Sequence, residues 1–329
     1  MCGMDELVVG ADLGGTSTRV TVATVGGARL VTVEGGGGNP TTHGAERAAA
    51  ELAATARRAL DGLEPGRVRA VVLGVAGRAT LDDERAAGAF REALAAVGIS
   101  VSPRYVGDAE VAFSSATAGA EGTVLLAGTG AMAVRIRDRR VDATADGLGW
   151  LLGDEGSAFW MGREAVRRAI AAICGTGAST ALAGAVCGRL LGDSGGGSAE
   201  RRRSGLIRAA AGQPPIELAA LAPLVVAAEA AGDAVAATIC DDAAARLVGL
   251  IGEVRATGES APLVLNGSVV REPASPVGRR VRELIAGRFG GDVLAPADGL
   301  VGAAWLAVRS IRPEWPDQRL TEIHARLAG

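Results

Sequence analysis

The stretch Leu7–Val22, LVVGADLGGTSTRVTV, carries residue types suited to binding a phosphate. An apolar run leads to Asp12, and a second β-rich run follows the turn. The turn consists of small and hydroxyl residues: Gly14, Gly15, Thr16, Ser17 and Thr18. Glycines let backbone N–H groups approach an anion, and hydroxyls add donors. A Mg²⁺ held through water would turn the repulsion between Asp12 and a phosphate into attraction. The alternative is an ordinary hairpin turn, which two glycines alone would favour.

The same theme recurs in Gly122–Ile136, GTVLLAGTGAMAVRI. Two apolar runs flank Gly128, Thr129 and Gly130, and no aspartate precedes this turn. A duplication at a spacing of about 115 residues predicts two related domains that face each other. A nucleotide between them would be gripped by one turn from each domain.

Asp108 follows an expected short strand at 102–106 and precedes an expected helix at 109–118. Ligand crevices of open α/β sheets lie at the carboxyl ends of strands, so this position suits a catalytic carboxylate. The alternative is that Asp108 simply caps the helix.

Two further segments carry polar residues suited to a sugar. The loop at 35–40, GGGGNP, places Asn39 on a glycine-rich turn, and a floppy linker is the alternative. The segment Asp146–Gly162, DGLGWLLGDEGSAFWMG, combines glycines and tryptophans with Asp154 and Glu155. It suits a sugar pocket, or a tight turn that caps a helix at 157–174, and both can hold together.

Composition sets the outer limits. The 329 residues suffice for two domains with substantial cores. The net charge of −3 gives no electrostatic reason to expect nucleic acid or a membrane surface as partner. The chain contains no lysine, so a lysine cannot act as phosphate clamp, Schiff base or general base.

The cysteines and histidines are scattered. The four cysteines form no CxxC pair, and His43 and His324 lie far apart in the sequence, which argues against zinc and against a disulfide framework. The acidic N-terminus is unlike a signal peptide, and the apolar segment 218–231 is too short to span a bilayer. We therefore expect a cytoplasmic protein.

The remaining pattern predicts an α/β domain with a mixed sheet, followed by a second domain rich in helices. In the first half we expect strands at 28–34 and 69–75, a helix at 44–60 capped by Thr41 or Thr42, and a helix at 82–97. In the second half we expect broken helices over 175–224, helices at 233–257, 276–289, 299–310 and 317–328, and strands at 261–270 and 292–294. The turn after 261–270 could receive a nucleoside or only reverse the chain.

Five motifs occur in a fixed order: DLGGTST at Asp12–Thr18, GDA at Gly107–Ala109, GTG at Gly128–Gly130, GDEGS at Gly153–Ser157 and NGS at Asn266–Ser268. Together they resemble the BadF/BadG/BcrA/BcrD-type ATPase family, and within it the N-acetylglucosamine kinase-like sugar kinases of the actin/hexokinase/Hsp70 superfamily. The resemblance covers about residues 7–308. Its most specific part is GDEGS preceded by GW.

The resemblance implies an α/β fold of two actin-like (ribonuclease H-like) domains with ATP in the cleft between them. The N-terminal domain would span residues 1–113 and the C-terminal domain residues 114–310, with the helix 311–329 packing back on the first domain. It implies that Asp12 assists Mg²⁺ and that Asp108 is the general base for the sugar 6-hydroxyl. The terminal phosphates would be held by Gly14, Gly15, Thr16, Thr18, Gly128, Thr129 and Gly130. The nucleoside would contact Gly267 and Ser268, and the sugar would contact Asn39, Asp108, Gly149, Asp154 and Glu155.

The implied activity is ATP-dependent phosphorylation of an amino sugar. Asp154 and Glu155 suit a cationic 2-amine, and the short GLGWLL before GDEGS in a lysine-free, arginine-rich chain resembles actinobacterial members that act on glucosamine. Glucosamine therefore ranks slightly above N-acetylglucosamine. Related kinases are often dimers, so we expect a homodimer.

Three other interpretations remain. An activator ATPase of a radical enzyme would hold an iron–sulfur cluster with cysteines such as Cys174 and Cys187. A repressor or sugar kinase with a zinc motif would need a cysteine cluster that the chain lacks. A sensor that only binds ATP would not need a base at Asp108.

Overall fold

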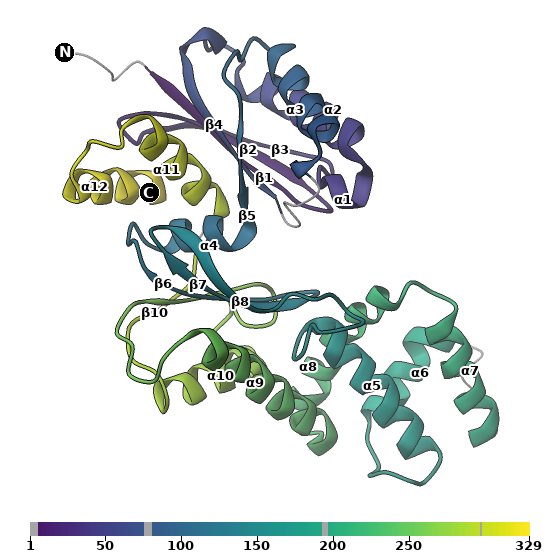
Figure 1. Cartoon of the computed structure of the whole chain (residues 1–329). Coiled ribbons are helices and arrows are strands. Elements are labelled where there is room, and N and C mark those ends of the chain that lie inside the picture. Colours follow the sequence, from purple (N-terminus) through teal and green to yellow (C-terminus); the bar gives the residue numbers. More distant parts are fainter. Residues whose placement is uncertain (1–5, 76–80, 193–196, 297) are drawn as a thin grey trace. The chain divides into compact units, whose positions relative to one another are not determined.

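The computed structural model describes residues 6–75, 81–192, 197–296 and 298–329. The chain divides into two compact units (Figure 1). Unit 1 comprises the residues up to Ala120, Asp138–Arg140 and Pro296–Gly329. Unit 2 comprises Glu121–Arg137 and Val141–Ala295. The domain limits that the resemblance implies, near residues 113 and 310, stay a prediction.

Unit 1 is built on a mixed five-stranded sheet in the order β3-β2-β1-β4-β5. The strands are β1 (Leu7–Leu13), β2 (Thr18–Thr24), β3 (Arg29–Gly35), β4 (Val68–Val75) and β5 (Arg104–Gly107). β1 pairs antiparallel with β2 and parallel with β4, and β4 pairs parallel with β5. The carboxyl ends of β1, β4 and β5 therefore meet at one edge of the sheet.

The two faces of this sheet carry separate cores because side chains alternate along a strand. Leu7, Val9 and Leu13 of β1 pack in a cluster with α2 (Ala45–Ala59) and α3 (Glu84–Ala95). On the opposite face the core contains Val8 and side chains of α4 (Asp108–Ala116), α11 (Gly299–Ile311) and α12 (Asp317–Ala328). In Figure 1 the α2–α3 layer and the α11–α12 layer lie on opposite sides of the strands.

Gly10 explains how closely α11 approaches β1. A Cβ at this position would lie 2.6 Å from the backbone nitrogen of Ala304 in α11. Any larger residue would push the helix off the sheet. Trp305 of the same helix is fully buried, and its indole N–H donates to the Leu320 carbonyl of α12 at 2.9 Å, which joins the last two helices.

The region after β3 differs from the sequence expectation. A short helix, α1 (Pro40–His43), precedes α2, and its N-cap is Asn39 rather than Thr41 or Thr42. The Asn39 side chain accepts from the backbone N–H groups of Thr41 and Thr42. Gly44, with φ of +80°, then separates α1 from α2. The expected helix at 44–60 is confirmed as α2, but its expected cap at Thr41 or Thr42 was wrong, because left-handed Gly44 is the N-cap of α2.

Unit 2 repeats the same sheet topology, in the order β8-β7-β6-β9-β10. Its strands are β6 (Gly122–Ala127), β7 (Ala131–Arg137), β8 (Arg140–Asp146), β9 (Leu263–Asn266) and β10 (Val293–Leu294). The sequence analysis assigned no strand to the β8 residues. β8 is mostly exposed, so it lacks the buried alternation by which the other strands are recognised.

The helices of unit 2 supply its core. They are α5 (Ala158–Ile173), α6 (Leu182–Leu191), α7 (Ala199–Ala211), a 3₁₀ turn at Pro215–Leu221, α8 (Ala222–Ala230), α9 (Ala234–Val254) and α10 (Pro276–Ala286). Side-chain caps begin α5 at Ser157, α9 at Asp233 and α10 at Ser275. Fully buried Leu247 and Ile251 of α9 belong to this core.

Within the described ranges, no single helix has both the length and the apolar character of a membrane span, although the bent pair Ala199–Ala211 and Pro215–Ala230 passes that test by length and composition.

Candidate functional site

The first glycine turn connects β1 and β2 and leaves backbone donors exposed. The N–H of Gly14 donates to the Ser17 carbonyl at 2.9 Å, which closes the turn. The N–H groups of Gly15 and Thr16 have no acceptor among the described residues. Two successive unsatisfied N–H groups in a glycine turn form a concave site suited to a phosphate oxygen.

Asp12 at the end of β1 takes part in a charge network that the sequence analysis missed. Its carboxylate, 39% exposed, accepts from Arg19 of β2 at 2.8 Å. Asp298, the N-cap of α11, bridges Arg19 at 3.3 Å and Arg29 at 2.7 Å. Asp12 and Arg19 are opposite partners in the hairpin register, so the sequence held the signal for the first pair. Asp298 comes from far along the chain and gave no such signal.

Thr18 lies deeper than the other hydroxyls of the turn. Its side chain is fully buried, and its hydroxyl has no hydrogen-bond partner among the described residues. A Cβ at Gly38 would lie 2.1 Å from that hydroxyl, so the glycine-rich loop packs directly on the hairpin. Gly38 and Asn39 both donate their N–H groups to the Gly14 carbonyl at 3.0 Å. The loop is thus hydrogen-bonded to the first glycine turn, and the interpretation of the loop as a floppy linker is wrong.

Asp108 lies at the same sheet edge as Asp12. It is the first residue of α4, and Gly107 occupies the N-cap, so the interpretation of Asp108 as the cap was wrong. Its carboxylate accepts from the N–H of Ala109 at 3.0 Å, and solvent still reaches the side chain. Desolvation by the surrounding protein raises the pKa of Asp108, and the charges of Asp12 and Glu110 raise it further. A raised pKa suits a carboxylate that takes up a proton.

The second glycine turn, in unit 2, is held by the start of α5. Gly128 donates to the Gly130 carbonyl at 2.9 Å. The N–H groups of Ala158 and Phe159 donate to the carbonyls of Gly128 and Thr129 at 2.9 and 3.1 Å. The carbonyls of the turn are therefore satisfied by the N-terminus of α5.

Asp154 braces the same turn. It is 6% exposed, has φ of +59°, and accepts from the N–H of Ala131 at 3.0 Å. Burial raises the pKa of Asp154, with a contribution from the charge of Asp146. Asp146, which the sequence analysis did not single out, accepts from the N–H groups of Asp154 and Glu155 at 2.9 and 3.0 Å.

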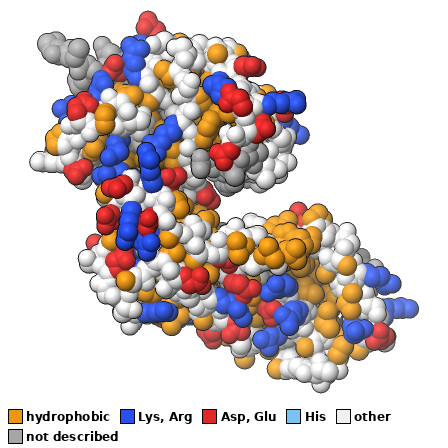
Figure 2. Space-filling model, in the orientation of Figure 1, with side chains coloured by type: hydrophobic (Ala, Val, Ile, Leu, Met, Phe, Trp, Pro, Cys, Tyr) orange, Lys and Arg blue, Asp and Glu red, His pale blue; other side chains and the backbone are white. Residues whose placement is uncertain are grey.

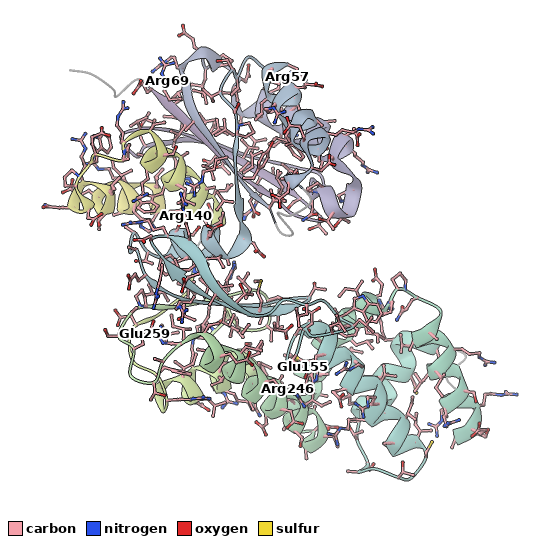
Figure 3. The ribbon with its side chains drawn as sticks, viewed as in Figure 1. Arg57, Arg69, Arg140, Glu155, Arg246 and Glu259 are labelled. Atoms are coloured by element: carbon pink, nitrogen blue, oxygen red, sulfur yellow. The ribbon has the colours of Figure 1, made fainter. Side chains whose placement is uncertain are left out.

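Glu155 points away from Asp154 and toward α9. Its carboxylate pairs with Arg246 at 2.8 Å and with Arg163 of α5 at 3.7 Å. Figure 3 shows Glu155 and Arg246 beside each other. Arg246 in turn stacks over the Trp160 ring, 4.8 Å from its centroid. Much of the Glu155 charge is therefore already compensated by arginines.

The segment around Gly149 exposes large apolar side chains. Leu148, Leu151 and Leu152 are 63%, 73% and 75% exposed. Gly149 has φ of +78° and its carbonyl accepts from Leu152 and Gly153. Hydrophobic side chains gather on the surface of unit 2 in Figure 2. These exposed leucines shortly precede the buried Asp154 in the sequence.

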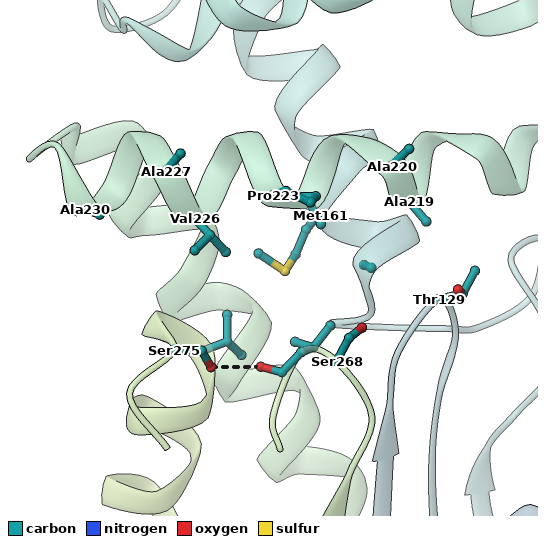
Figure 4. A pocket seen from close by; sticks show the side chains of 14 residues that line it. Thr129, Met161, Ala219, Ala220, Pro223, Val226, Ala227, Ala230, Ser268 and Ser275 are labelled. Carbon is teal, nitrogen blue, oxygen red and sulfur yellow. Dashed lines mark hydrogen bonds between the residues drawn. The ribbon is translucent and has the colours of Figure 1, made fainter. Parts of the chain in front are cut away.

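A cavity of about 570 Å³ opens in unit 2 beside the second turn. Figure 4 shows Pro223 and Val226 on one wall, Met161 projecting into the space, and Thr129 and Ser268 on the facing turns. Gly267 has φ of +102°, and a Cβ there would lie 2.3 Å from the Ala127 carbonyl oxygen. The cavity thus unites Thr129 and Ser268, which the motifs predicted from distant parts of the chain.

Comparison with known proteins identifies the family. Residues 9–307 match the BadF/BadG/BcrA/BcrD ATPase family. The chain therefore belongs to this family, and the resemblance inferred from its motifs is confirmed.

One characterised relative matches part of the chain. The N-acetylmuramic acid/N-acetylglucosamine kinase of Clostridium acetobutylicum is 26% identical over 181 residues, which are 54% of this chain and 58% of that protein. The match spans less than two thirds of the relative's length.

Solved structures confirm the fold. The candidate N-acetylglucosamine kinase of Chromobacterium violaceum superposes with a TM-score of 0.71 at 23% identity, covering 92% of this chain and 99% of the other. The candidate N-acetylglucosamine kinase of Porphyromonas gingivalis superposes with a TM-score of 0.62 at 22% identity, covering 90% of this chain and 96% of the other. A ROK family glucokinase of Streptomyces griseus, solved with glucose and AMPPNP, superposes with a TM-score of 0.56 at 21% identity. The match covers 92% of this chain and 99% of the other. The predicted fold of two actin-like α/β domains is therefore confirmed.

Proposed function

We propose that this protein is an ATP-dependent hexosamine kinase that phosphorylates the 6-hydroxyl of glucosamine or N-acetylglucosamine. The observation that carries the proposal is in unit 1: two carboxylates, Asp12 and Asp108, share one sheet edge with a glycine turn in which the N–H groups of Gly15 and Thr16 have no acceptor among the described residues. The kinase names of relatives in sequence and fold support it.

The residues of unit 1 fit Mg·ATP and an alcohol. Gly15 and Thr16 would donate backbone N–H groups to the terminal phosphates, with Gly14 and Thr18 shaping the turn. Asp12 would hold Mg²⁺ through water, and the ion supplies neutralisation of phosphate charge when bound. Asp108 would accept the proton of the sugar hydroxyl as the hydroxyl oxygen bonds to the γ-phosphorus of ATP and the bond from that phosphorus to the bridging oxygen breaks, which releases ADP.

The residues of unit 2 fit the remainder of the nucleotide. Gly128, Thr129 and Gly130 would form a second phosphate turn. The cavity beside Ser268 and Gly267 is apolar on the α8 side, which suits a nucleobase and ribose.

The sugar contacts would come from Asn39, Gly149, Asp154 and Glu155, with Asp108 at the reacting hydroxyl. A cationic 2-amine would require a carboxylate, and Asp154 is the candidate because arginines already engage Glu155. The exposed leucines near Gly149 instead favour an N-acetyl group, which needs an apolar niche. This observation keeps N-acetylglucosamine as a full second candidate.

A coupled assay of ADP release tests the proposal directly. The purified chain is given Mg·ATP with glucosamine, N-acetylglucosamine, N-acetylmuramic acid, glucose or mannosamine, and the Asp108→Asn variant is run in parallel. We expect one amino sugar to stimulate ADP release in the parent chain and not in the variant. If no sugar stimulates ADP release, the kinase proposal is wrong.

The activator ATPase remains the alternative of another class. Among the described cysteines, Cys187 and Cys240 are buried and Cys174 is exposed. Burial raises the pKa of Cys187, one of the two cysteines considered as cluster ligands, and raises the pKa of Cys240 to about 11, which disfavours the thiolate form of both. Iron and sulfide analysis of anaerobically purified protein decides this point, since a stoichiometric cluster would favour the activator. The expected homodimer and the cytoplasmic location stay predictions, and light scattering checks the first.

A further inference from the structure

His43, at the end of α1, contacts the phosphate turn through its ring. Its Nε2 lies 2.7 Å from the carbonyl oxygen of Gly15. Because a carbonyl can only accept, Nε2 must carry the proton in this contact. Both the imidazolium and the neutral tautomer protonated on Nε2 can make it. The side chain itself is on the surface of unit 1.

This contact fixes the direction of one peptide group. In a trans peptide the carbonyl and the following N–H point in opposite directions. When His43 holds the Gly15 carbonyl, the N–H of Thr16 points to the opposite side. The preceding carbonyl, of Gly14, is held in the same manner by the N–H groups of Gly38 and Asn39 at 3.0 Å, so the N–H of Gly15 is directed as well.

The held peptides are those that would otherwise rotate easily. Gly14 and Gly15 have no side chains to restrict rotation, and a Cβ at Gly15 would meet nothing closer than the Thr42 hydroxyl at 3.8 Å. By contrast, the space beside the contact is filled, because a Cβ at Gly37 would lie 2.4 Å from both the Gly15 oxygen and the His43 Nε2. The orientation of the turn thus depends on the loop that covers it.

We propose that His43 is a positioning residue that aims the Thr16 N–H at the terminal phosphate and couples nucleotide binding to sugar binding. The coupling follows from its location, because Asn39, the proposed sugar contact, is the N-cap of α1 and His43 ends the same helix. The Asn39 side chain already caps α1, so a sugar that contacts Asn39 acts on the short helix that carries the donor to the Gly15 carbonyl. This inference rests on the proposed kinase function.

Titration calorimetry tests the coupling. Mg·AMPPNP and the accepted amino sugar are each titrated into the parent chain, alone and with the other ligand saturating. We expect each ligand to tighten the other in the parent. In His43→Ala the Mg·AMPPNP affinity falls about fivefold, the change expected for losing one hydrogen bond. In the same variant the two ligands should no longer tighten each other's binding, while the affinity for the sugar without nucleotide stays within about twofold of the parent.

Two further variants separate positioning from structure. His43→Gln keeps a nitrogen donor at the Nε2 position and should restore most of the coupling. Arg57→Ala, on the exposed side of α2, should match the parent in every titration. Steady-state kinetics should show the His43→Ala effect mainly in KM for Mg·ATP rather than in kcat.

Distinct results would overturn the inference and the function. If the parent phosphorylates a sugar but its two ligands bind independently, or if His43→Ala keeps the full coupling, the inference is wrong and the kinase stands. If His43→Gln fails like His43→Ala, the donor role is wrong. If no sugar stimulates ADP release at all, the proposed function fails first.

Discussion

The two glycine turns occupy equivalent places in two sheets of the same order, yet they are held by different means. The turn of unit 1 is hydrogen-bonded to a loop and to an imidazole, and it lies at the sheet edge that also carries Asp12 and Asp108. The turn of unit 2 is bonded to the backbone of α5 and braced by buried Asp154. The first turn thus leaves donors exposed among charges, whereas the second is locked into its own unit.

The two turns therefore differ in the carboxylates near them. Asp12 and Asp108 lie at the sheet edge of the first turn, whereas Asp154 beside the second turn is buried and bonded to the Ala131 N–H. The second turn is rigid because a helix N-terminus satisfies its carbonyls. A substitution beside one turn should therefore change that turn and leave the other intact.

The largest effect is expected for Asp108→Asn. Loss of the general base should lower kcat about 10²–10⁴-fold, because the amide cannot accept the hydroxyl proton. Calorimetry should find Mg·ATP and sugar binding close to the parent. Asp61→Asn, an exposed change in the same unit, is the matched control. A kcat near the parent value in Asp108→Asn would remove Asp108 from catalysis.

The pH dependence of kcat/KM should report the same group. Desolvation raises the pKa of Asp108, and catalysis requires its ionised form. Activity should therefore fall as the pH drops through that raised pKa, with the acid limb above the usual range of a carboxyl group. The residual activity of Asp108→Asn should lack this limb. If the variant keeps the limb, another group is responsible.

The next largest effect is expected for Asp12→Asn, which should weaken the response of activity to Mg²⁺ so that more of the ion is required. The asparagine oxygen can still accept from Arg19, so the hairpin should keep its shape while the negative charge is lost. We expect the Mg²⁺ concentration for half activity to rise about 10–100-fold, as for other residues that act on a metal through its ligands. Titration of Mg²⁺ at fixed ATP measures this shift, and an unchanged midpoint would contradict the assigned role.

A matched glycine pair tests the two turns against each other. In Gly130→Ala the new Cβ would lie 2.4 Å from the Asp154 Oδ1, so Asp154 must give up its bond to Ala131. The unsatisfied buried group should cost about 1–3 kcal/mol, or roughly 2–10 °C in Tm. In Gly15→Ala the nearest atom is 3.8 Å away, so Tm should hold while KM for ATP rises. Equal losses of Tm in Gly130→Ala and Gly15→Ala would contradict the conclusion that the second turn is more tightly packed than the first.

The sequence predicted the parts of this comparison that depend on local pattern. Buried alternation revealed the hairpins, and the order of the motifs revealed the family. The sequence could not reveal the contacts that hold each turn. Asp298 reaches Arg19 across 279 positions, and the Asp146 carboxylate accepts from the Asp154 N–H across 8 positions. The sequence did not reveal β8 because its side chains are mostly exposed. It did not reveal the Asn39 cap because the four-residue helix that Asn39 caps is too short to show a helical period.

The smallest stability effect, and the sharpest test of unit 2, is expected for Asp154→Asn. Burial raises the pKa of Asp154, so the folded state holds its proton more tightly than the unfolded chain does. The parent should therefore gain stability as the pH falls through that raised pKa, and at neutral pH it carries the cost of a buried charge. Asparagine has no such charge, and its side-chain oxygen can still accept from the Ala131 N–H. Thermal melts should place the Tm of the variant at or slightly above that of the parent near neutral pH, and the two Tm values should converge in acid.

The KM for the sugar should nonetheless rise in Asp154→Asn, most for a substrate with a free amine. A variant that melts well below the parent at neutral pH would mean that the charge itself holds the second turn, and the contrast with the charged first turn would disappear.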